Sequence, residues 1–190
     1  MEFLETRVEW IEQSRRRMAE RYPEREKYIE MPYSTRSHAL RYRPYDGTRI
    51  FASLTSAEIV LSYPITMDYR SPEVAEAARR AIIETLRAEA KEYLPGRVTE
   101  LSERTGLKCR SVTVRATVSK WGSCSARNDL SLSIYLMLLP DELIDFVILH
   151  ELCHTVYHNH SDRFHALLDS IVAGREKELS RALRKYRARV

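Results

Sequence analysis

Two segments in the second half of the chain alternate strictly between apolar and polar residues. Apolar side chains occupy every second position of residues 112–118 and again of residues 130–136. Alternation with a period of two is typical of strands that bury one face. The linker between them, SKWGSCSARND, is polar and too long for a tight hairpin. We therefore predict two strands joined by a longer loop.

Helical spacing of apolar residues marks most of the remaining chain. Ser71 and Pro72 are typical of a helix start, and Pro95–Gly96 predicts a stop, with a short second helix ending at Gly106. A wide apolar stripe follows Pro140. The predicted helices are 8–21, 71–95, 97–104, one that begins at Pro140–Asp141, one capped by Ser161 and a basic one after Gly174.

The region before Pro64 is different, because short apolar runs are separated by turn residues. Residues 38–43, 50–54 and 58–62 are predicted strands, and Asp46–Gly47 is a strong turn signal between the first two. We therefore expect an α+β protein. Residues 1–66 would form an N-terminal helix and a small β-rich region. Residues 67–190 would form a domain in which a helix packs on a small antiparallel sheet.

Composition indicates an ordinary globular protein. The chain has 190 residues, of which 44% are hydrophobic and 31% charged. Its three cysteines, Cys109, Cys124 and Cys153, have no framework spacing, which favours a reducing compartment. The N-terminus shows no signal peptide, and no apolar run is long enough to span a bilayer. We expect a cytoplasmic protein without a membrane partner.

The net charge of +4 is unevenly distributed. Residues 174–190 hold seven basic and two acidic side chains. Such a stretch can bind nucleic acid or another polyanion. More often a charge run is the solvated face of a helix.

The sequence His150-Glu151-Leu152-Cys153-His154 is an H-E-x-x-H motif. Residues four apart lie on one face of a helix, so both imidazoles can bind one metal ion. Glu151 lies beside this pair and can reach a water molecule without being a ligand. If the motif occurs by chance, it is an ordinary helix with two hydrogen-bonded histidines and an exposed glutamate.

A catalytic zinc site needs a third protein ligand. His158 lies about 12 Å from His150 along an unbroken helix, which is too far for both to bind one ion. The chain must turn back, and Asn159 can end a helix in a left-handed conformation. His160 is the favoured third ligand, with His165 next and Glu176 as a third choice; His38 is expected to be an ordinary strand residue.

The run SKWGSCSARNDLSLSIYLMLLPDELIDFVILHELCH, followed by HNHSDRFHALL, resembles the YgjP-like metallopeptidase family. That family is related to the SprT-like zinc proteases and to the wider zincins. The resemblance implies a zincin-like fold, one Zn²⁺ ion and a peptide or protein substrate. It also makes His160 the last zinc ligand, and it implies that Glu151 activates water as a general base.

Two departures concern the surroundings of the metal. The spacing of the three histidines equals that of metzincins, but Tyr157 replaces the metzincin glycine. The family commonly has Trp where His165 stands.

In zincins the strand before the active-site helix commonly lies at a sheet edge, and residues 129–135 would have that role here.

The loop that begins at Trp121 would then approach the metal, unless it is only a packed structural turn. Cys124 is either a redox-sensitive switch or a small packed residue, and Cys153 is expected to face the core. Tyr157, Arg127 and Lys120 are candidates for oxyanion stabilisation. Substrate-binding candidates are Trp121, Gly122, Ser123, Cys124, Arg127 and Tyr157.

Two other functions compete with peptide hydrolysis. One is a metal-dependent nucleoside triphosphate pyrophosphohydrolase, an activity also attached to YgjP-like proteins, with Arg115, Lys120 and Arg127 holding the phosphates. The sequence contains no glycine-rich loop of the kind that binds phosphate, which counts against this function. The other is a non-catalytic zinc module that contacts nucleic acid through the basic C-terminal helix, in which Glu151 would have no purpose.

Overall fold

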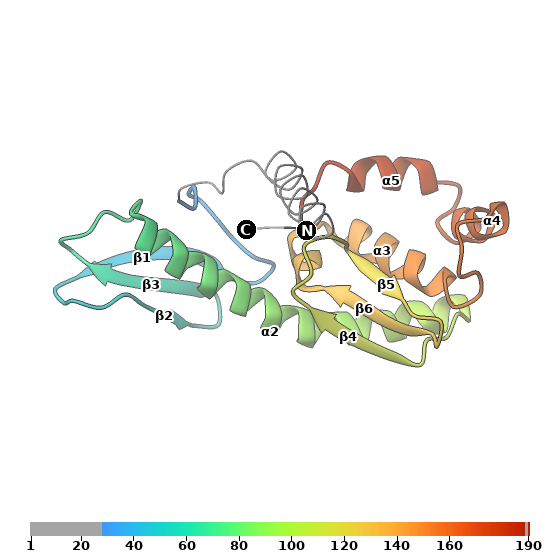
Figure 1. Ribbon diagram of the computed structural model, residues 1–190, viewed down its shortest axis with the longest axis horizontal. Coiled ribbons are helices and arrows are strands. Elements are labelled where there is room, and N and C mark those ends of the chain that lie inside the picture. Colours follow the sequence, from blue (N-terminus) through green and yellow to red (C-terminus); the bar gives the residue numbers. More distant parts are fainter. Residues whose placement is uncertain (1–27, 189) are drawn as a thin grey trace, which may run out of the picture.

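One long helix connects the two halves of the protein (Figure 1). The computed structural model describes residues 28–188 and 190, so the helix predicted over residues 8–21 lies outside the described residues. Helix α2 (Pro72–Thr105) runs from one three-stranded sheet to a second one. The remaining helices lie at the end of the molecule that carries the second sheet.

Helix α2 begins and ends at the predicted residues. The Ser71 hydroxyl accepts a hydrogen bond from the Val74 amide at 3.4 Å, and Pro72 occupies the first turn. Gly106 ends the helix in the left-handed region at φ 74°, and its amide donates to the Ser102 carbonyl.

The predicted break at Pro95 is wrong. Pro95 removes one backbone hydrogen bond, but its ring faces solvent, and Leu94 and Val98 on either side are fully buried. Burial of apolar side chains on both sides offsets the lost bond, so the helix continues to Thr105. The two helices expected in this region are therefore one.

The first sheet consists of β1 (Ala39–Tyr45), β2 (Phe51–Leu54) and β3 (Glu58–Pro64), in the order β1-β3-β2. β3 is parallel to β1 and antiparallel to β2. The turn at Asp46–Gly47 therefore does not close a hairpin, because the following residues carry the chain across to the far side of β3. β3 lies in the centre because nearly all of its side chains are buried.

The second sheet consists of β4 (Ser111–Arg115), β5 (Gly122–Cys124) and β6 (Asp129–Ser133), in the order β4-β6-β5. β4 is parallel to β6, whereas β5 is antiparallel to it. The sheet is thus mixed rather than antiparallel, because the loop after β4 folds back as β5 on the other side of β6.

The strand predicted over residues 130–136 is shorter than expected. After Ser133 the chain forms a 3-10 helix, η1 (Ile134–Leu138), whose first residues are buried. Leu139 and Pro140 then lead into α3 (Asp141–Cys153), followed by α4 (Asp162–Ile171) and α5 (Glu176–Leu183). The three predicted C-terminal helices are confirmed.

A single apolar core extends along the molecule, from Leu40 and Ile59 in the first sheet to Phe164 in α4. The α+β class is confirmed. Because α2 packs on both sheets, the division at residue 66 stays a prediction. Among the described helices, none combines the length and the apolar character that crossing a membrane requires.

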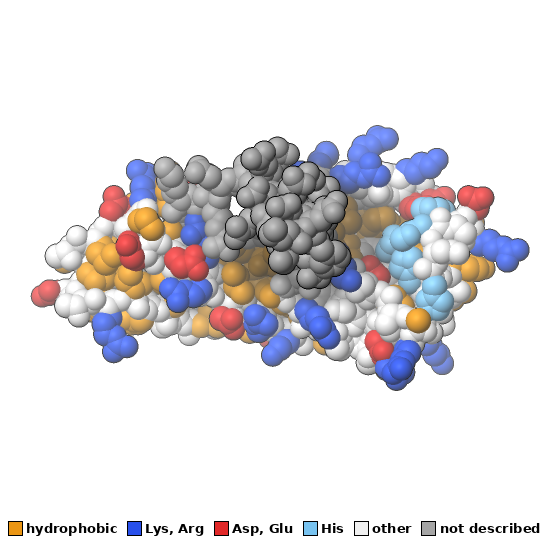
Figure 2. All heavy atoms as spheres, in the orientation of Figure 1, with side chains coloured by type: hydrophobic (Ala, Val, Ile, Leu, Met, Phe, Trp, Pro, Cys, Tyr) orange, Lys and Arg blue, Asp and Glu red, His pale blue; other side chains and the backbone are white. Residues whose placement is uncertain are grey.

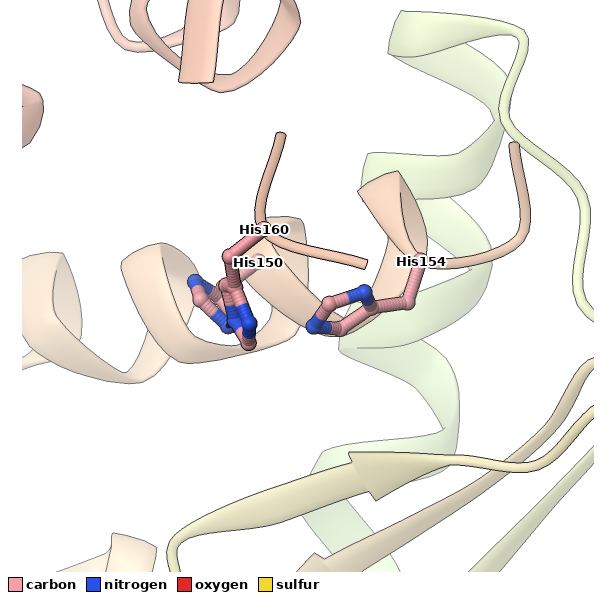
Figure 3. Close-up of side chains that lie close together, drawn as sticks. All are labelled: His150, His154 and His160. Atoms are coloured by element: carbon pink, nitrogen blue, oxygen red, sulfur yellow. Dashed lines mark hydrogen bonds between the residues drawn. The ribbon is translucent and has the colours of Figure 1, made fainter. Parts of the chain in front are cut away.

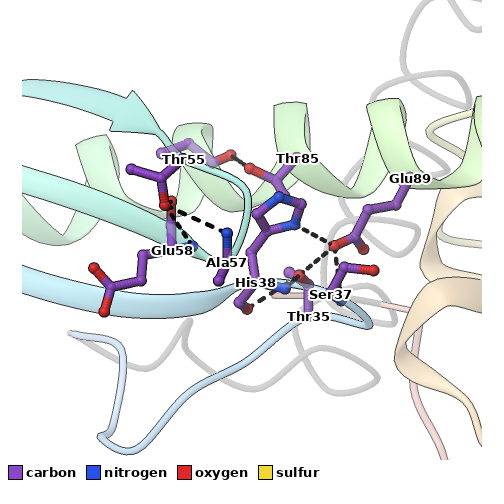
Figure 4. A network of polar contacts seen from close by, with 9 residues as sticks. Thr35, Ser37, His38, Thr55, Ala57, Glu58, Thr85 and Glu89 are labelled. Atoms are coloured by element: carbon purple, nitrogen blue, oxygen red, sulfur yellow. Dashed lines mark hydrogen bonds and ion pairs between the residues drawn. The ribbon is translucent and has the colours of Figure 1, made fainter.

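His38 has a different role from that of a strand residue. It directly precedes β1, and its Nδ1 atom lies 2.7 Å from Glu89 Oε1 on α2 (Figure 4). The same oxygen accepts hydrogen bonds from the Thr35 hydroxyl at 2.6 Å and the Ser37 amide at 3.0 Å. This buried network fixes the start of the first sheet on α2.

Candidate metal centre

Helix α3 places His150 and His154 one turn apart, with ring centroids 5.0 Å from each other. The last residue of the helix is Cys153, and His154 is its C-cap. The Tyr157 amide donates to the Cys153 carbonyl at 3.0 Å in the turn that follows. The chain can therefore reverse before His160.

The reversal does not use a left-handed Asn159. Among the described residues other than glycine, positive φ occurs at Asn128 and Ala173. The helix ends earlier than expected, so several residues share the turn. A single strained residue is unnecessary.

The three histidines converge on one point (Figure 3). One ligand nitrogen of each residue lies within 4.8 Å of those of the other two. His150 Nε2 and His160 Nε2 are 3.1 Å apart, and the His160 ring centroid lies 4.6 Å from that of His154. A set of three imidazoles with nitrogens directed at a common point fits a tetrahedral Zn²⁺ with one open position.

The orientation of His154 is fixed by the backbone of the turn. Its Nδ1 atom lies 2.9 Å from the Tyr157 carbonyl oxygen, which can only accept a hydrogen bond. Nδ1 therefore carries the proton, and Nε2 keeps its lone pair for a metal. Tyr157 thus contributes through its main chain.

Phe164 on α4 supports all three rings. Its side chain is fully buried, and its ring centroid lies 4.9 Å from His150, 4.5 Å from His154 and 4.9 Å from His160. It stacks on His154 with an interplanar angle of 27°. One apolar side chain therefore holds the spacing of the cluster.

Burial also sets the charge state of the cluster. It lowers the pKa of His150 to about 4, with His154 and His160 adding to the effect. Burial lowers the pKa of His154 as well, although its hydrogen bond to Tyr157 opposes the shift. Neutral imidazoles are the form that binds a metal.

Glu151 lies on the buried side of α3, with only 6% of its surface exposed. Burial raises the pKa of its carboxyl from 4.5 to about 7, and the positive charge of Lys120 acts in the opposite direction. A carboxyl with a pKa near neutrality can both accept and donate a proton near pH 7.

The strand beside α3 is β5, not β6. β6 lies in the centre of the sheet, so the edge expected over residues 129–135 is instead formed by Gly122–Cys124. The alternation of residues 130–136 identified a strand but not its neighbours. The loop with Trp121 supplies an edge strand next to α3.

The other predicted substrate-binding residues are distributed around this strand. Trp121, Ser123 and Cys124 are partly exposed on or next to β5, and Trp121 accepts a backbone hydrogen bond from Ser133 at 2.9 Å. Arg127 is exposed in the turn between β5 and β6, where its amide bonds to Ser125. The described contacts do not bring Arg127 to the histidines.

The alternative ligands lie outside the cluster. His165 and Glu176 pair with each other, with 2.5 Å between Nδ1 and Oε1. His165 lies near the cluster, with its ring centroid 6.2 Å from that of His160. His158 is exposed. Together the histidines form a patch at the end of the molecule that carries α4 (Figure 2).

The cysteines do not resemble an activated thiol. Burial raises the pKa of Cys124 to about 11, with Glu151 adding to the shift. Cys124 is therefore a protonated thiol at neutral pH, which argues against a reactive thiolate. Cys153 is fully buried, as predicted.

Two relationships in the site were not predicted from the sequence. Phe164 was assigned only to the buried face of its helix, and nothing in a periodic pattern distinguishes a core phenylalanine from one that backs a metal cluster. Gly122 lies directly against Glu151. Its position next to Trp121 in the loop was the only sign of a special role.

A helix with two histidines one turn apart, a third histidine beyond a turn and a buried carboxylate next to a sheet edge together define a zincin-like metal-dependent hydrolase. The chain belongs to the YgjP-like metallopeptidase family, whose domain pattern matches residues 1–186. The protein is therefore, at the level of its family, a metal-dependent peptidase.

Two solved structures are similar to part of the chain. One is the metallopeptidase zymogen abylysin of Pyrococcus abyssi, with 20% identity and a TM-score of 0.43 over 48% of this chain and 92% of that one. The other is the metallopeptidase zymogen jannalysin of Methanocaldococcus jannaschii, with 23% identity and a TM-score of 0.43 over 48% of this chain and 93% of that one. No curated protein sequence matches the chain.

Proposed function

We propose that this protein is a zinc peptidase in which His150, His154 and His160 hold one Zn²⁺ ion and Glu151 is the general base. The observation that carries the proposal is the convergence of three imidazole nitrogens beside a buried carboxyl. A zinc ion on three histidines supplies Lewis-acid activation of a carbonyl and of water.

Glu151 has the properties that proton transfer requires. Its pKa of about 7 lets it accept a proton from the attacking water and return that proton to the leaving amine. Since it follows His150 directly on α3, the same helix that positions two ligands also positions the base.

Lys120 is the best supported of the three candidates for oxyanion stabilisation. Its positive charge opposes the rise in the pKa of Glu151, an effect seen for neither of the other two candidates. Arg127 lies in an exposed turn, and the contact of Tyr157 with His154 is made by its main-chain carbonyl rather than by its hydroxyl. A fixed positive charge near the reacting carbonyl lowers the energy of an anionic transition state.

The substrate proposed is an extended peptide that adds to the open edge of β5. A three-residue strand beside the catalytic helix offers main-chain groups for such pairing. A nucleic-acid partner has less support, because Arg175 already bonds to Glu142 and Glu178. Part of the basic C-terminal charge is thereby neutralised.

The test is hydrolysis by the zinc-loaded protein of two panels, unfolded proteins and nucleoside triphosphates. Glu151→Gln should retain zinc and lose peptide cleavage by roughly a hundredfold or more, because general base catalysis contributes about 10²–10⁴. Glu103→Gln, an exposed carboxyl on α2, is the matched control and should remain active.

Metal content separates the ligand assignment from the activity. His160→Ala should lose zinc, whereas His158→Ala, an exposed histidine two residues earlier, should keep it. Triphosphate cleavage that depends on Glu151 would replace the peptidase proposal. Full zinc in His160→Ala would show that the third ligand is wrong.

A further inference from the structure

The first sheet lies at the end of the molecule away from the metal centre, and one of its edges is open. β2 pairs with β3 along one side and is the last strand of the sheet (Figure 1). All four of its residues, Phe51–Leu54, are exposed. Within the described part of the chain, nothing pairs with its other side.

The register shows which backbone groups are unpaired. The Thr55 amide donates to the Glu58 carbonyl at 2.9 Å, so these two residues form a hydrogen-bonded pair. In an antiparallel ladder such pairs recur at every second residue, so Ser53 also exchanges hydrogen bonds with its partner on β3, and so does Phe51. The amides and carbonyls of Ala52 and Leu54 therefore point outward, toward the open edge. A strand added there would find two residues with free donors and acceptors.

Natural sheets usually protect such an edge with charges or proline. β1, the opposite edge of the sheet, has Arg41, Arg43 and Pro44. β2 has the sequence Phe-Ala-Ser-Leu, without a charge or a proline. The contrast between the two edges indicates that β2 is covered in the functional protein.

Beside this edge lies an apolar groove of about 480 Å³ between β2 and α2. The side chains of Ala52 and Leu54 share a face with Leu61 and Ile59, their partners on β3. Leu54 is 52% exposed. Apolar contact area is thus available next to the unpaired backbone.

The α2 side of the groove carries Arg80 and Glu84, one helical turn apart and both exposed, and Glu84 also pairs with Arg87 of the same helix at 3.4 Å. A two-fold axis through the edge would place Arg80 of one copy opposite Glu84 of the other, and the reverse. The rim is therefore complementary to itself in charge. An arbitrary extended peptide would gain no such match.

We propose that β2 is a dimerisation strand, which pairs antiparallel with β2 of a second copy of this chain. In the symmetric register, Ser53 of one copy lies opposite Ser53 of the other. The outward amide and carbonyl of Ala52 then form hydrogen bonds with those of Leu54 in the second copy. The two sheets join into one, and Leu54 of each copy enters the groove of the other. The metal centres stay at the two distant ends.

The test is the oligomeric state of the full-length protein by sedimentation velocity over the micromolar range. The wild type should be a dimer, and Leu54→Lys should be a monomer, since the lysine places charge in the groove. Ile65→Lys is the control, because Ile65 is 67% exposed and lies outside the groove. It should remain dimeric. Thermal unfolding of each variant verifies the fold.

A charge exchange gives a readout that a folding defect would not imitate. Arg80→Glu and Glu84→Arg should each weaken the dimer about tenfold, because attraction across the axis becomes repulsion. The double variant should restore much of the wild-type affinity. A monomeric wild type, or equal dimerisation in Leu54→Lys and Ile65→Lys, would overturn the proposal. Capture of an unfolded peptide by the wild-type monomer, lost in Leu54→Lys, would instead assign the edge to substrate.

Discussion

Gly122 leaves room for the side chain of Glu151. A β-carbon at position 122 would lie 2.7 Å from Glu151 Cγ and 2.8 Å from its Oε1. Real β-carbons do not approach other atoms so closely, so one of the two groups would have to move. The absence of a side chain on β5 therefore helps to determine where the carboxylate of α3 lies.

The first prediction follows from this contact. In Gly122→Ala the methyl group displaces the Glu151 carboxylate, which is flexible at its end, rather than the strand. We expect kcat to fall about tenfold to a hundredfold, because a displaced base loses part of the contribution of proton transfer. Bound zinc, measured by mass spectrometry of the native protein, should be unchanged.

Gly96→Ala is the matched control for that variant. A β-carbon at position 96 meets no atom within 4 Å, and the residue lies inside α2. The replacement should stabilise the helix by about 0.5–1 kcal/mol and leave kcat unchanged. Equal activity of both variants would show that Gly122 does not position the base.

The second prediction concerns Lys120. Its charge lowers the pKa of Glu151, so Lys120→Met should raise that pKa further. The acidic limb of the pH profile of kcat/KM should move to higher pH, by less than about one unit because Lys120 is exposed and screened. If Lys120 also stabilises the oxyanion, kcat should fall at every pH. Lys108→Met, at another exposed lysine, should change neither quantity.

The third prediction concerns the ring beneath the histidines. Phe164→Leu removes the contacts with three imidazoles while keeping an apolar side chain, so zinc affinity should fall about tenfold. Competition with a chromogenic chelator measures the change. Leu168→Val, one turn later and also fully buried, should destabilise the fold without this loss of affinity. The same affinity loss in both variants would mean that Phe164 acts only through packing.

The features of this protein that depend only on residues close together in the chain could be predicted from the sequence. Helix α3 and its motif follow from spacing within one segment, and Ser71 and Gly106 mark the ends of α2 through their own backbone preferences. His160 was favoured because His158 is too far from His150 along a helix. In the structure the three ligand nitrogens do converge.

The relationships between distant segments could not be predicted in this way. Alternation indicates a strand, but it is silent on which strands become neighbours, so the edge position was assigned to β6 instead of β5. Pro95 carries a strong local preference for a break, which burial of Leu94 and Val98 overrides. Both differences come from tertiary packing, to which short-range patterns are insensitive.

The last prediction uses the pKa of Glu151 in the metal-free protein. The carboxyl titrates near pH 7 in the folded chain, against 4.5 as its ordinary value. As the pH rises through this window the unfolded chain loses its proton first, so ionisation favours unfolding. The stability that the protonated carboxyl provides is complete below pH 4.5 and is lost toward pH 7.

Replacing Glu151 with Gln removes this titration. In chelator-treated protein, urea unfolding at pH 5 should give a stability difference between wild type and Glu151→Gln of less than about 1 kcal/mol. At pH 8 the variant should be more stable, by up to about 3 kcal/mol. The histidines titrate in both proteins and cancel in the comparison. A difference that does not change between the two pH values would show that burial does not raise the pKa of Glu151, and the base would then need another explanation for its proton transfer near neutral pH.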